Sequence, residues 1–456
     1  MDQLPARVST RTLLGYGTGQ LGAQIFRDTP AVLLPIFMTT MLGVPAWLSG
    51  IVILIPKLWL IACDPLVGAW SDRQKAAHGR TPFLLFGAIL TGLSFLSFFV
   101  VTDYGHPWVA AAAICVLFLI GSTAFSIFSV PYLATASELS TDPHERTRIL
   151  MVRMLFATVG VLIGVGVAQP LVFALGGGAY GWHIMAVSLA AVCLVSMLVP
   201  ALTLRRVAML PGGDSPERLL GQLKPVFANK PYMVLLATCF VQNIGQASGY
   251  TVLGFVFLYA LQAIWLVPAF IIVMVIFSGI SQPLWLSLSR RWGKPRTYVV
   301  SSVLWTLVTI TWFFATPGHD ILVTLPFIGP LATEHVLILL RAAVIGLTNS
   351  GFVLLSLSLL TDTVAYQRHH SGVAREGVFS GLFSAAEKLS FAVGPLIAGV
   401  VLSLNGFTSS TGGAAAQSPQ AITGILLLYS IIPAGTQVLS LLIFSRFKLA
   451  TYGPGA

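Results

Sequence analysis

The chain has 456 residues, of which 56% are hydrophobic and only 9% carry a charge. Soluble domains of this size carry about a quarter charged residues, so this composition, with a mean hydropathy of +0.87, excludes a water-soluble globular protein and predicts that lipid covers most of the surface. The formal net charge of +10 does not indicate nucleic-acid binding, because the basic residues are spread over short segments between apolar runs.

Twelve apolar segments are long enough to cross a bilayer, since a spanning helix needs about 20 mostly apolar residues. Six lie at residues 12–40, 46–71, 83–102, 107–137, 148–175 and 182–204. The other six lie at 231–262, 265–289, 297–316, 333–361, 375–404 and 418–446. We therefore predict an all-α membrane protein with twelve transmembrane helices in two six-helix halves, residues 1–204 and 231–456, joined by a polar linker, 205–230.

Lysine and arginine are confined to alternate connections on this model. They occur in the N-terminal segment, in the second and fourth connections, in the central linker, and again at 290–296, at Arg368 and in the C-terminal tail. The opposite loops, such as 102–106 and 405–417, contain none. By the positive-inside rule, both termini are predicted to be cytoplasmic, in a bacterial-type inner membrane.

A short motif occurs once in each half. Asp64-Pro65-Leu66 leads to Ser71-Asp72-Arg73, and 218 residues later Gln282-Pro283-Leu284 leads to Ser289-Arg290-Arg291. Both copies end the second helix of their half. Repeated, parallel six-helix halves are the organisation of the major facilitator architecture.

Ionisable residues inside the predicted helices are candidates for function. Each costs at least about 2.5–3.5 kcal/mol at the bilayer centre, so each must be paired, hydrated or useful. The set is Arg27, Asp28, Lys57, Asp64, Arg153, Arg341, Glu387 and Lys388. Spacing places Lys57 and Asp64 on one face of the second helix, and Gln24 and Asp28 on one face of the first, whereas the neighbours Arg27 and Asp28 diverge. A structural ion pair is the alternative role for each charge.

Glycine runs at 15–22 and at Gly160 and Gly164 predict close approach of the first and fifth helices to their neighbours. No phosphate-binding, hydrolase or zinc motif is present in the sequence. We therefore predict a transporter and not an enzyme, without a metal or other cofactor, whose partners are a small-molecule substrate, a coupling cation and membrane lipids. We expect a monomer, with uphill transport driven by an ion gradient.

Several motifs resemble one known family. The segment Asp64-Pro65-Leu66-Val67-Gly68, Ser71-Asp72-Arg73 and Gly79-Arg80-Thr81-Pro82-Phe83 is similar to the helix 2 to helix 3 region of the glycoside–pentoside–hexuronide:cation symporters, the melibiose-permease-like branch of the major facilitator superfamily. Further similar segments are Gly15-Tyr16-Gly17-Thr18-Gly19, Val130-Pro131-Tyr132, Glu145-Arg146, Arg153, Thr361-Asp362, Arg375-Glu376-Gly377 and Lys388.

The resemblance implies a role for three of the embedded charges. Asp64 falls on a carboxylate of the family's cation site, and Arg153 and Lys388 fall on polar residues of the central cavity. Other family positions differ: Leu60 stands where a second cation-site carboxylate is expected, and Ser129 where a helix 4 aspartate is expected.

These departures change the expected coupling ion and substrate. A site with one carboxylate suits a proton better than sodium, with Asp28 as a second titrating group. Gln24 takes the place of the family's sugar-holding carboxylate on helix 1, and Leu133 the place of an aromatic residue. We expect a cation-coupled symporter of a small glycoside, sugar acid or other organic anion. Its more basic pocket, formed by Gln24, Lys57, Ser129, Arg153 and Lys388, favours a substrate with an anionic group, such as a uronide.

Charged residues at the cytoplasmic helix ends form a second expected group. We predict that they act as a gate that clasps those ends during alternating access. The set is Asp72, Arg73, Arg290, Arg291, Asp362 and Arg375.

Two other functions fit the sequence. A lysophospholipid or amphiphile symporter of the same fold would use apolar Leu60 and Leu133 for an acyl chain. A non-transporting sensor or assembly protein on the same scaffold would leave the embedded charges unexplained.

Overall fold

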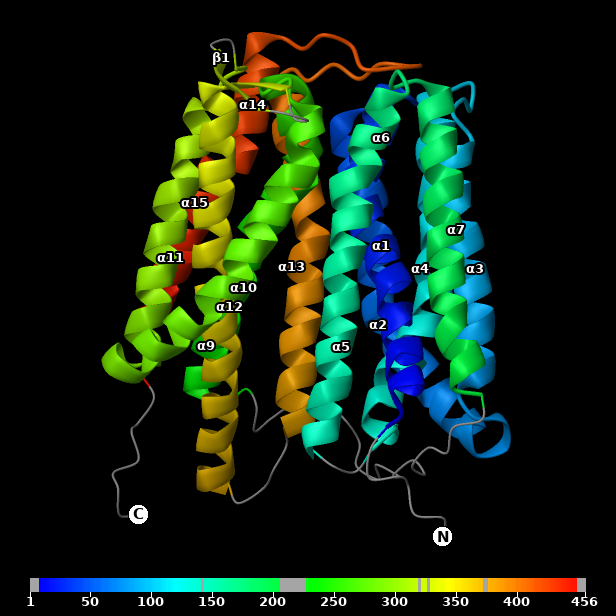
Figure 1. Cartoon of the computed structure of the whole chain (residues 1–456), viewed down its shortest axis with the longest axis vertical. Coiled ribbons are helices and arrows are strands. Elements are labelled where there is room, and N and C mark those ends of the chain that lie inside the picture. Colours follow the sequence, from blue (N-terminus) through cyan, green and yellow to red (C-terminus); the bar gives the residue numbers. More distant parts are fainter. Residues whose placement is uncertain are drawn as a thin grey trace. The chain divides into compact units, whose positions relative to one another are not determined.

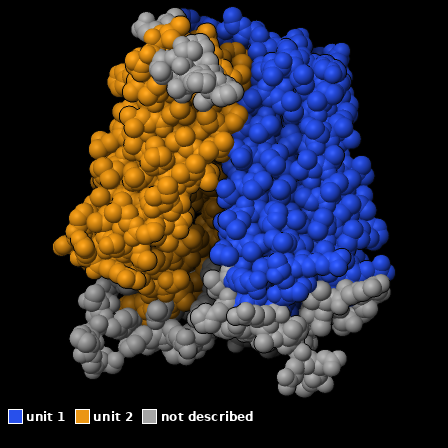
Figure 2. Space-filling model, viewed as in Figure 1, with its two compact units in different colours: residues 1–214, 399–421 blue, residues 215–398, 422–456 orange. Residues whose placement is uncertain are grey.

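The computed structural model describes residues 8–140, 143–205, 227, 229–318, 321–325, 329–371 and 376–448. These residues are almost entirely helical (Figure 1). They divide into two compact units, coloured separately in Figure 2: unit 1 comprises Met1–Asp214 and Gly399–Ala421, and unit 2 comprises Ser215–Ala398 and Ile422–Ala456.

Unit 1 is built from α1 (Thr10–Thr40), α2 (Ala46–His78), α3 (Thr81–Val100), α4 (Pro107–Glu138), α5 (Pro143–Val161), the π-helical turn η1 (Leu162–Val167), α6 (Ala168–Ala174) and α7 (Ala179–Thr203). Unit 2 contains α9 (Lys230–Phe255), η2 (Val256–Ala260), η3 (Ile264–Leu266), α10 (Val267–Trp292), α11 (Lys294–Ile310), η4 (Thr311–Phe314), α12 (Thr333–Ser371), most of α13 (Glu376–Leu404) and of α14 (Pro419–Tyr429), and α15 (Ile431–Phe444). Between η4 and α12, β1 (Ile321–Leu325) and β2 (Gly329–Ala332) pair antiparallel.

The first helix of each unit begins at a side-chain cap. The Ser9 hydroxyl accepts a hydrogen bond from Thr12 N at 3.2 Å, and Asn229 Oδ1 accepts one from Tyr232 N at 3.0 Å. Such caps satisfy backbone donors that a helix start leaves without a partner. The linker expected at 205–230 lies almost wholly outside the described residues.

Ten helices in the described part of the chain are long and apolar enough to cross a membrane. The remaining two of the twelve expected spans correspond to α1 and α9, which are not among those ten. Most side chains of α1 from Leu13 to Thr40 are buried by the protein. A helix enclosed by its neighbours needs no apolar surface for lipid, so α1 can carry polar residues that lower its hydropathy.

Glycines let α1 pack closely against α5 and α7, as the sequence predicts. A Cβ atom added at Gly19 would lie 2.7 Å from Pro200 of α7, and one added at Gly160 of α5 would lie 2.7 Å from Gln24 Cβ. Beyond Gly160 the helix widens into η1, where the Thr29 hydroxyl donates to Gly164 O at 2.9 Å. Backbone and side chain of α1 are thereby fixed against α5.

Each unit has an aromatic core. In unit 1, Phe37 packs edge-on against Phe99, which stacks on Trp182 with ring centroids 5.8 Å apart. In unit 2, Tyr298 packs against Phe444 at 4.5 Å. These cores join α1, α3 and α7 in unit 1, and α11 and α15 in unit 2.

A segment between α13 and α14, residues 408–413, caps the C-terminal end of α1, and we call it the strap. Ser410 N donates to Thr39 O at 2.8 Å, Gly413 N to Thr40 O at 2.9 Å and Gly412 N to Met41 O at 3.1 Å. Leu42 and Thr411 form an antiparallel bridge. The last carbonyls of a helix lack partners within the helix, and here the strap supplies their donors.

Candidate functional site

Four polar residues form one ridge along α1 in unit 1. Tyr16, Gln20, Gln24 and Asp28 follow one another at intervals of four, which places them on one face of the helix. All four are buried, with Gln20 at 8%, Gln24 at 5% and Asp28 at 8% exposed. Buried polar groups need hydrogen-bond partners; Gln20, Gln24 and Asp28 bond to one another along the ridge, and the Tyr16 hydroxyl donates to Tyr132 O of α4.

The ridge is a continuous hydrogen-bonded chain that starts on α5. Arg153 Nε donates to Gln20 Oε1 at 2.7 Å, and Gln20 Nε2 donates to Gln24 Oε1 at 3.1 Å. Gln24 Nε2 then donates to Asp28 Oδ2 at 2.6 Å. Every donor in this chain therefore points from Arg153 toward Asp28.

Arg153 is held by neutral groups. Besides Gln20, its guanidinium lies over the ring of Tyr132 at 5.7 Å from the centroid. Tyr132 stacks on Tyr16 at 4.5 Å, and each phenol donates to the backbone carbonyl of the other tyrosine. Within the described ranges, Arg153 forms no ion pair, so its remaining N–H groups have no carboxylate acceptor.

Two further cations surround Asp28. Arg27 Nε lies 3.0 Å from Asp28 Oδ1 although the two are neighbours in sequence, and its side chain is 62% exposed. The two residues do diverge as expected, since Asp28 is buried and the Arg27 side chain is exposed, but the long arginine side chain reaches back to the adjacent carboxylate. Lys57 of α2 lies close enough to Asp28 and Arg27 for a Coulombic interaction with both.

Asp64 belongs to a separate contact between α2 and α4. The Ser126 hydroxyl donates to its Oδ1 at 2.6 Å. The sequence singled out Ser129, which is half-buried on α4 one turn after Ser126. The structure thus brings together Gln24, Asp28 and Arg153, with Lys57 alongside, and pairs Asp64 with a serine that the sequence did not identify.

In unit 2, the embedded charges have different surroundings. Lys388 and Glu387 lie on α13 with exposed side chains. Arg341 of α12 forms an ion pair with Glu334 and lies 5.2 Å from the ring centroid of Trp312. The Arg341 and Glu334 side chains are each 12% exposed, so Arg341 is a structural cation of unit 2.

The residues expected to form a gate are only partly described. The Asp72 side chain and the whole of Arg375 lie outside the described part, and Arg73, Arg290 and Arg291 are exposed. Asp362 pairs with Lys294 Nζ at 2.7 Å. The sequence did not point to this partner, which opens α11.

A buried charge cluster that the sequence missed joins three helix ends of unit 1. Arg80, just before α3, donates to both carboxylate oxygens of Glu138 at the end of α4, and to the Ser71 hydroxyl of α2. Arg80 is 4% and Glu138 8% exposed. The Lys294–Asp362 pair joins the start of α11 to α12, so each unit has a cation opening a helix and a carboxylate on the helix that follows it.

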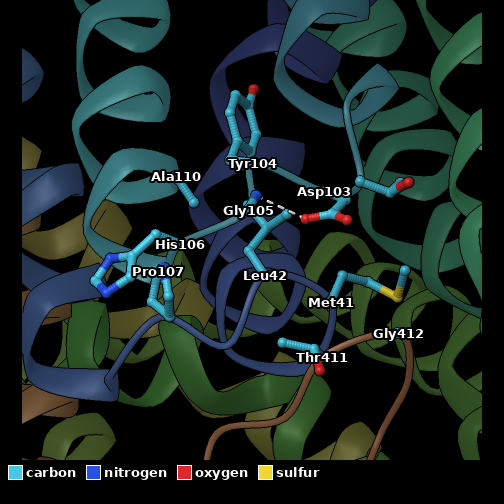
Figure 3. Close-up of a pocket in the computed structure, with 11 residues that line it drawn as sticks. Met41, Leu42, Asp103, Tyr104, Gly105, His106, Pro107, Ala110, Thr411 and Gly412 are labelled. Carbon is cyan, nitrogen blue, oxygen red and sulfur yellow. Dashed lines mark hydrogen bonds between the residues drawn. The ribbon is translucent and has the colours of Figure 1, made fainter.

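A pocket of about 340 Å³ lies at the opposite end of unit 1, beside the strap (Figure 3). The α3–α4 loop, the end of α1 and the strap line it, with Asp103 accepting a hydrogen bond from Gly105 N at 2.7 Å. Burial raises the pKa of the Tyr104 phenol. No member of the α1 ridge lines this pocket, so it is distinct from the candidate site.

Comparison with known proteins identifies the family. The model of the MFS/sugar transport protein family matches residues 15–451. Similar proteins include a Salmonella typhimurium protein provisionally assigned as a sulfoquinovose importer (26% identity, covering 98% of this chain and 91% of the relative), an Escherichia coli glucuronide carrier protein homolog (25%; 97% and 93%) and an isoprimeverose transporter of Lactiplantibacillus pentosus (24%; 95% and 88%).

Solved structures show the same fold. A bacterial homolog to the human lysosomal transporter Spinster matches with a TM-score of 0.69 at 14% identity, covering 99% of this chain and 100% of that one. The nucleoside transporter NupG matches with a TM-score of 0.64 at 16% identity, covering 96% and 99%. The chain is an integral, multi-pass membrane protein and not an enzyme, and it belongs to the MFS/sugar transport protein family of the major facilitator superfamily.

Proposed function

We propose that the protein is a cation-coupled symporter for a small glycoside or sugar acid that carries an anionic group. The observation that carries this proposal is the state of Arg153, a half-buried guanidinium without a carboxylate partner among the described residues. Guanidinium groups bind carboxylates and other oxyanions with paired, charge-assisted hydrogen bonds. An anionic substrate group would supply the acceptor that Arg153 lacks.

The charge balance of the embedded residues favours the same class of substrate. The membrane-embedded part of unit 1 contains the cations Arg27, Lys57 and Arg153, against the carboxylates Asp28 and Asp64. Cations therefore exceed carboxylates in this part of the described chain, and the excess grows when a carboxylate takes up a proton. An anion restores neutrality at low dielectric, where unbalanced charge is costly.

The names of the relatives agree with a carbohydrate-type substrate. Two of the three described above refer to anionic sugars, a glucuronide and sulfoquinovose, and one to the neutral disaccharide isoprimeverose. We assign the anionic class to this chain because of Arg153, and we assign Lys57, Ser129 and Lys388 as further substrate contacts. The Gln24 amide is bonded to Gln20 and Asp28, so we assign Gln24, a substrate contact in the sequence-based prediction, a role that acts through Arg153. An amphiphile carrier is the alternative that the experiment below separates.

The proposed topology has twelve spans, with α1 and α9 crossing the membrane as the first helix of each half. Both termini and the linker lie in the cytoplasm of a bacterial-type cell, and the protein works as a monomer in the inner membrane. Transport proceeds by alternating access of the two halves, with the charged residues at the cytoplasmic helix ends acting as the gate.

We propose Asp64 as the coupling carboxylate and the proton as the coupling ion. Asp64 accepts from the Ser126 hydroxyl, and Leu60, one turn earlier on α2, adds no second carboxylate. One carboxylate suits a proton better than a sodium ion, which needs several oxygen ligands. An imposed proton gradient should drive uptake at constant sodium. Uptake driven by a sodium gradient at constant pH, and not by a proton gradient, would contradict this assignment.

A matched pair of probes tests the substrate class. Methyl β-D-glucuronide and methyl β-D-glucoside differ only at C6, where the first has a carboxylate and the second a hydroxymethyl group. Proteoliposomes containing the purified protein should accumulate the glucuronide and not the glucoside, and Arg153→Ala should abolish this uptake while Arg296→Ala, at an exposed position, leaves it intact. Equal uptake of both probes, or uptake confined to a lysophospholipid, would overturn the proposal.

A further inference from the structure

We propose that Gln20 and Gln24 form a proton-linked relay, in which the protonation of Asp28 decides whether Arg153 is held by Gln20 or is available to the anionic substrate. The inference rests on the proposed function and adds to it how substrate and proton are linked. Gln20 and Gln24 act here as positioning residues, because they act on the substrate through Arg153.

The direction of the hydrogen bonds carries the argument. Ionised Asp28 can only accept, so Gln24 must present its Nε2 to Oδ2, at 2.6 Å. Gln24 then has only its Oε1 for Gln20 Nε2, at 3.1 Å, which leaves Gln20 Oε1 to accept from Arg153 at 2.7 Å. The ionised carboxylate therefore fixes both amides in the orientation that holds Arg153.

Protonation reverses each step. A proton from the aqueous phase adds to Oδ2 of Asp28 and makes it a donor. Its preferred partner is then Gln24 Oε1, so the Gln24 amide turns over and presents Nε2 to Gln20. Gln20 must then accept this hydrogen bond with its Oε1, so the Gln20 amide also turns over and its Nε2 points at the Arg153 Nε–H. Two donors then face each other, and the guanidinium is released toward an anion.

Burial makes the relay obligatory. Gln20 and Gln24 are 8% and 5% exposed, and the Asp28 side chain is 12% exposed, so bulk water does not readily replace a lost partner. Gly160 allows Gln24 to lie directly against α5, where an added Cβ would stand 2.7 Å from Gln24 Cβ. Side chains packed this closely rearrange by turning an amide rather than by moving apart.

The charged groups that face Asp28 in the described part of the chain are cations. Arg27 on α1 and Lys57 on α2 are the charged groups beside it, and Arg153 reaches it from α5 through the amides. The helices α3, α4 and α7 also pack near α1, and no charged side chain in their described parts pairs with Asp28. In this relay, the proton on Asp28 raises the affinity of Arg153 for the anion. By linkage, the bound anion raises the affinity of Asp28 for the proton by that same factor.

The experiment measures binding of methyl β-D-glucuronide to the purified protein by isothermal calorimetry between about pH 5.5 and about pH 8.5, where the probe stays ionised. We expect the affinity to increase at least about 5-fold toward acid pH, the lower limit of ordinary coupling between sites. Asp28→Asn, whose amide can donate permanently, should show the acid-pH affinity throughout. Gln24→Met and Gln20→Met each cut the relay and should bind the probe without this pH dependence.

Controls separate the relay from the proposed function. Gln242→Met makes the same exchange at a buried glutamine of α9 in unit 2, whose Oε1 accepts from the Tyr298 hydroxyl at 2.6 Å, and it should titrate like the parent. Asp64→Asn should also keep the pH dependence, because Asp64 contacts Ser126 of α4 and is not part of the relay. Loss of the dependence in Asp64→Asn would overturn the assignment to Asp28.

Two results would overturn the relay without affecting the proposed role of Arg153 in substrate binding. They are an affinity of the parent that is flat with pH, and a full pH dependence in both glutamine variants. An Arg153→Ala protein that binds the glucuronide as tightly as the parent would instead overturn the proposed function itself.

Discussion

Gly160 of α5 lies so close to Gln24 of α1 that a Cβ atom added to the glycine would stand 2.7 Å from Gln24 Cβ and 2.7 Å from Leu21 O. This contact fixes the middle of the polar ridge against the helix that carries Arg153. The close packing of α1 against α5 at Gly160 and the hydrogen-bonded chain along α1 therefore depend on each other.

Gly160→Ala should disturb both the contact between α1 and α5 and the hydrogen-bonded chain. Overpacking a tight contact costs about 1–3 kcal/mol, so we expect a lower melting temperature in detergent and weaker glucuronide binding. Gly279→Ala on α10 is the matched control, because a Cβ there meets nothing within 4 Å, and alanine in a helix is stabilising by about 0.5–1 kcal/mol. Equal melting temperatures for the two variants would contradict the contact.

Asp64→Asn should uncouple transport. An asparagine cannot exchange a proton, so we expect loss of accumulation against a gradient in proteoliposomes, while exchange of labelled for unlabelled substrate continues. Ser126→Ala removes the donor to Asp64 Oδ1 but keeps the carboxylate, so accumulation should continue at a reduced rate. Accumulation by Asp64→Asn at the parent level would remove Asp64 from the coupling mechanism.

The buried and the exposed ion pair at helix ends should differ in strength. Removing one partner of a buried pair costs about 3–5 kcal/mol, whereas exposed pairs contribute about 0–1 kcal/mol. The Arg80 and Glu138 side chains are 5% and 10% exposed, and those of Lys294 and Asp362 are 38% and 30% exposed. Thermal unfolding of Arg80→Ala and Lys294→Ala should show a large loss for the first and a small one for the second; similar losses would show that burial does not set the difference.

The strap can be tested by cross-linking. Gly43 N bonds to Ser410 O and Gly412 N to Met41 O, which makes Leu42 and Thr411 a directly opposed pair without mutual hydrogen bonds. Such pairs have Cα atoms about 4.5 Å apart, within the disulfide range of about 4.4–6.8 Å. Leu42→Cys combined with Thr411→Cys should form a disulfide in air that raises the melting temperature until reductant is added, with each single variant unchanged. Free thiols in the double variant would contradict the capping of α1 by the strap.

Hydropathy and charge placement predict the membrane class of the chain, because lipid imposes a composition that water-soluble proteins do not have. Hydropathy does not mark α1 and α9 as spans in the structure, and most of the residues of both helices are buried by protein. The spacing of Gln24 and Asp28 predicts their contact, since residues four apart share a helix face. Gln20 extends the same spacing, but it carries no charge and so lacks the signal that marks an ionisable residue inside a membrane helix.

Contacts between helices were harder to predict. Ser126 and Ser129 lie one turn apart on α4, and the rotation of α4 against α2 decides which of them reaches Asp64. That rotation depends on packing and leaves no local pattern. The strap is attached through backbone groups, which every residue carries, so no side-chain motif could reveal it.

The most direct test of the central claim is the affinity of methyl β-D-glucuronide relative to methyl β-D-glucoside, measured by calorimetry on the parent protein and on Arg153→Gln. Leaving a charged partner unpaired in a buried site costs about 2–5 kcal/mol, so the parent should prefer the glucuronide by at least about 30-fold. Arg153→Gln should bind the two probes almost equally. A preference that survives in Arg153→Gln, or its absence from the parent, would show that Arg153 does not recognise an anion.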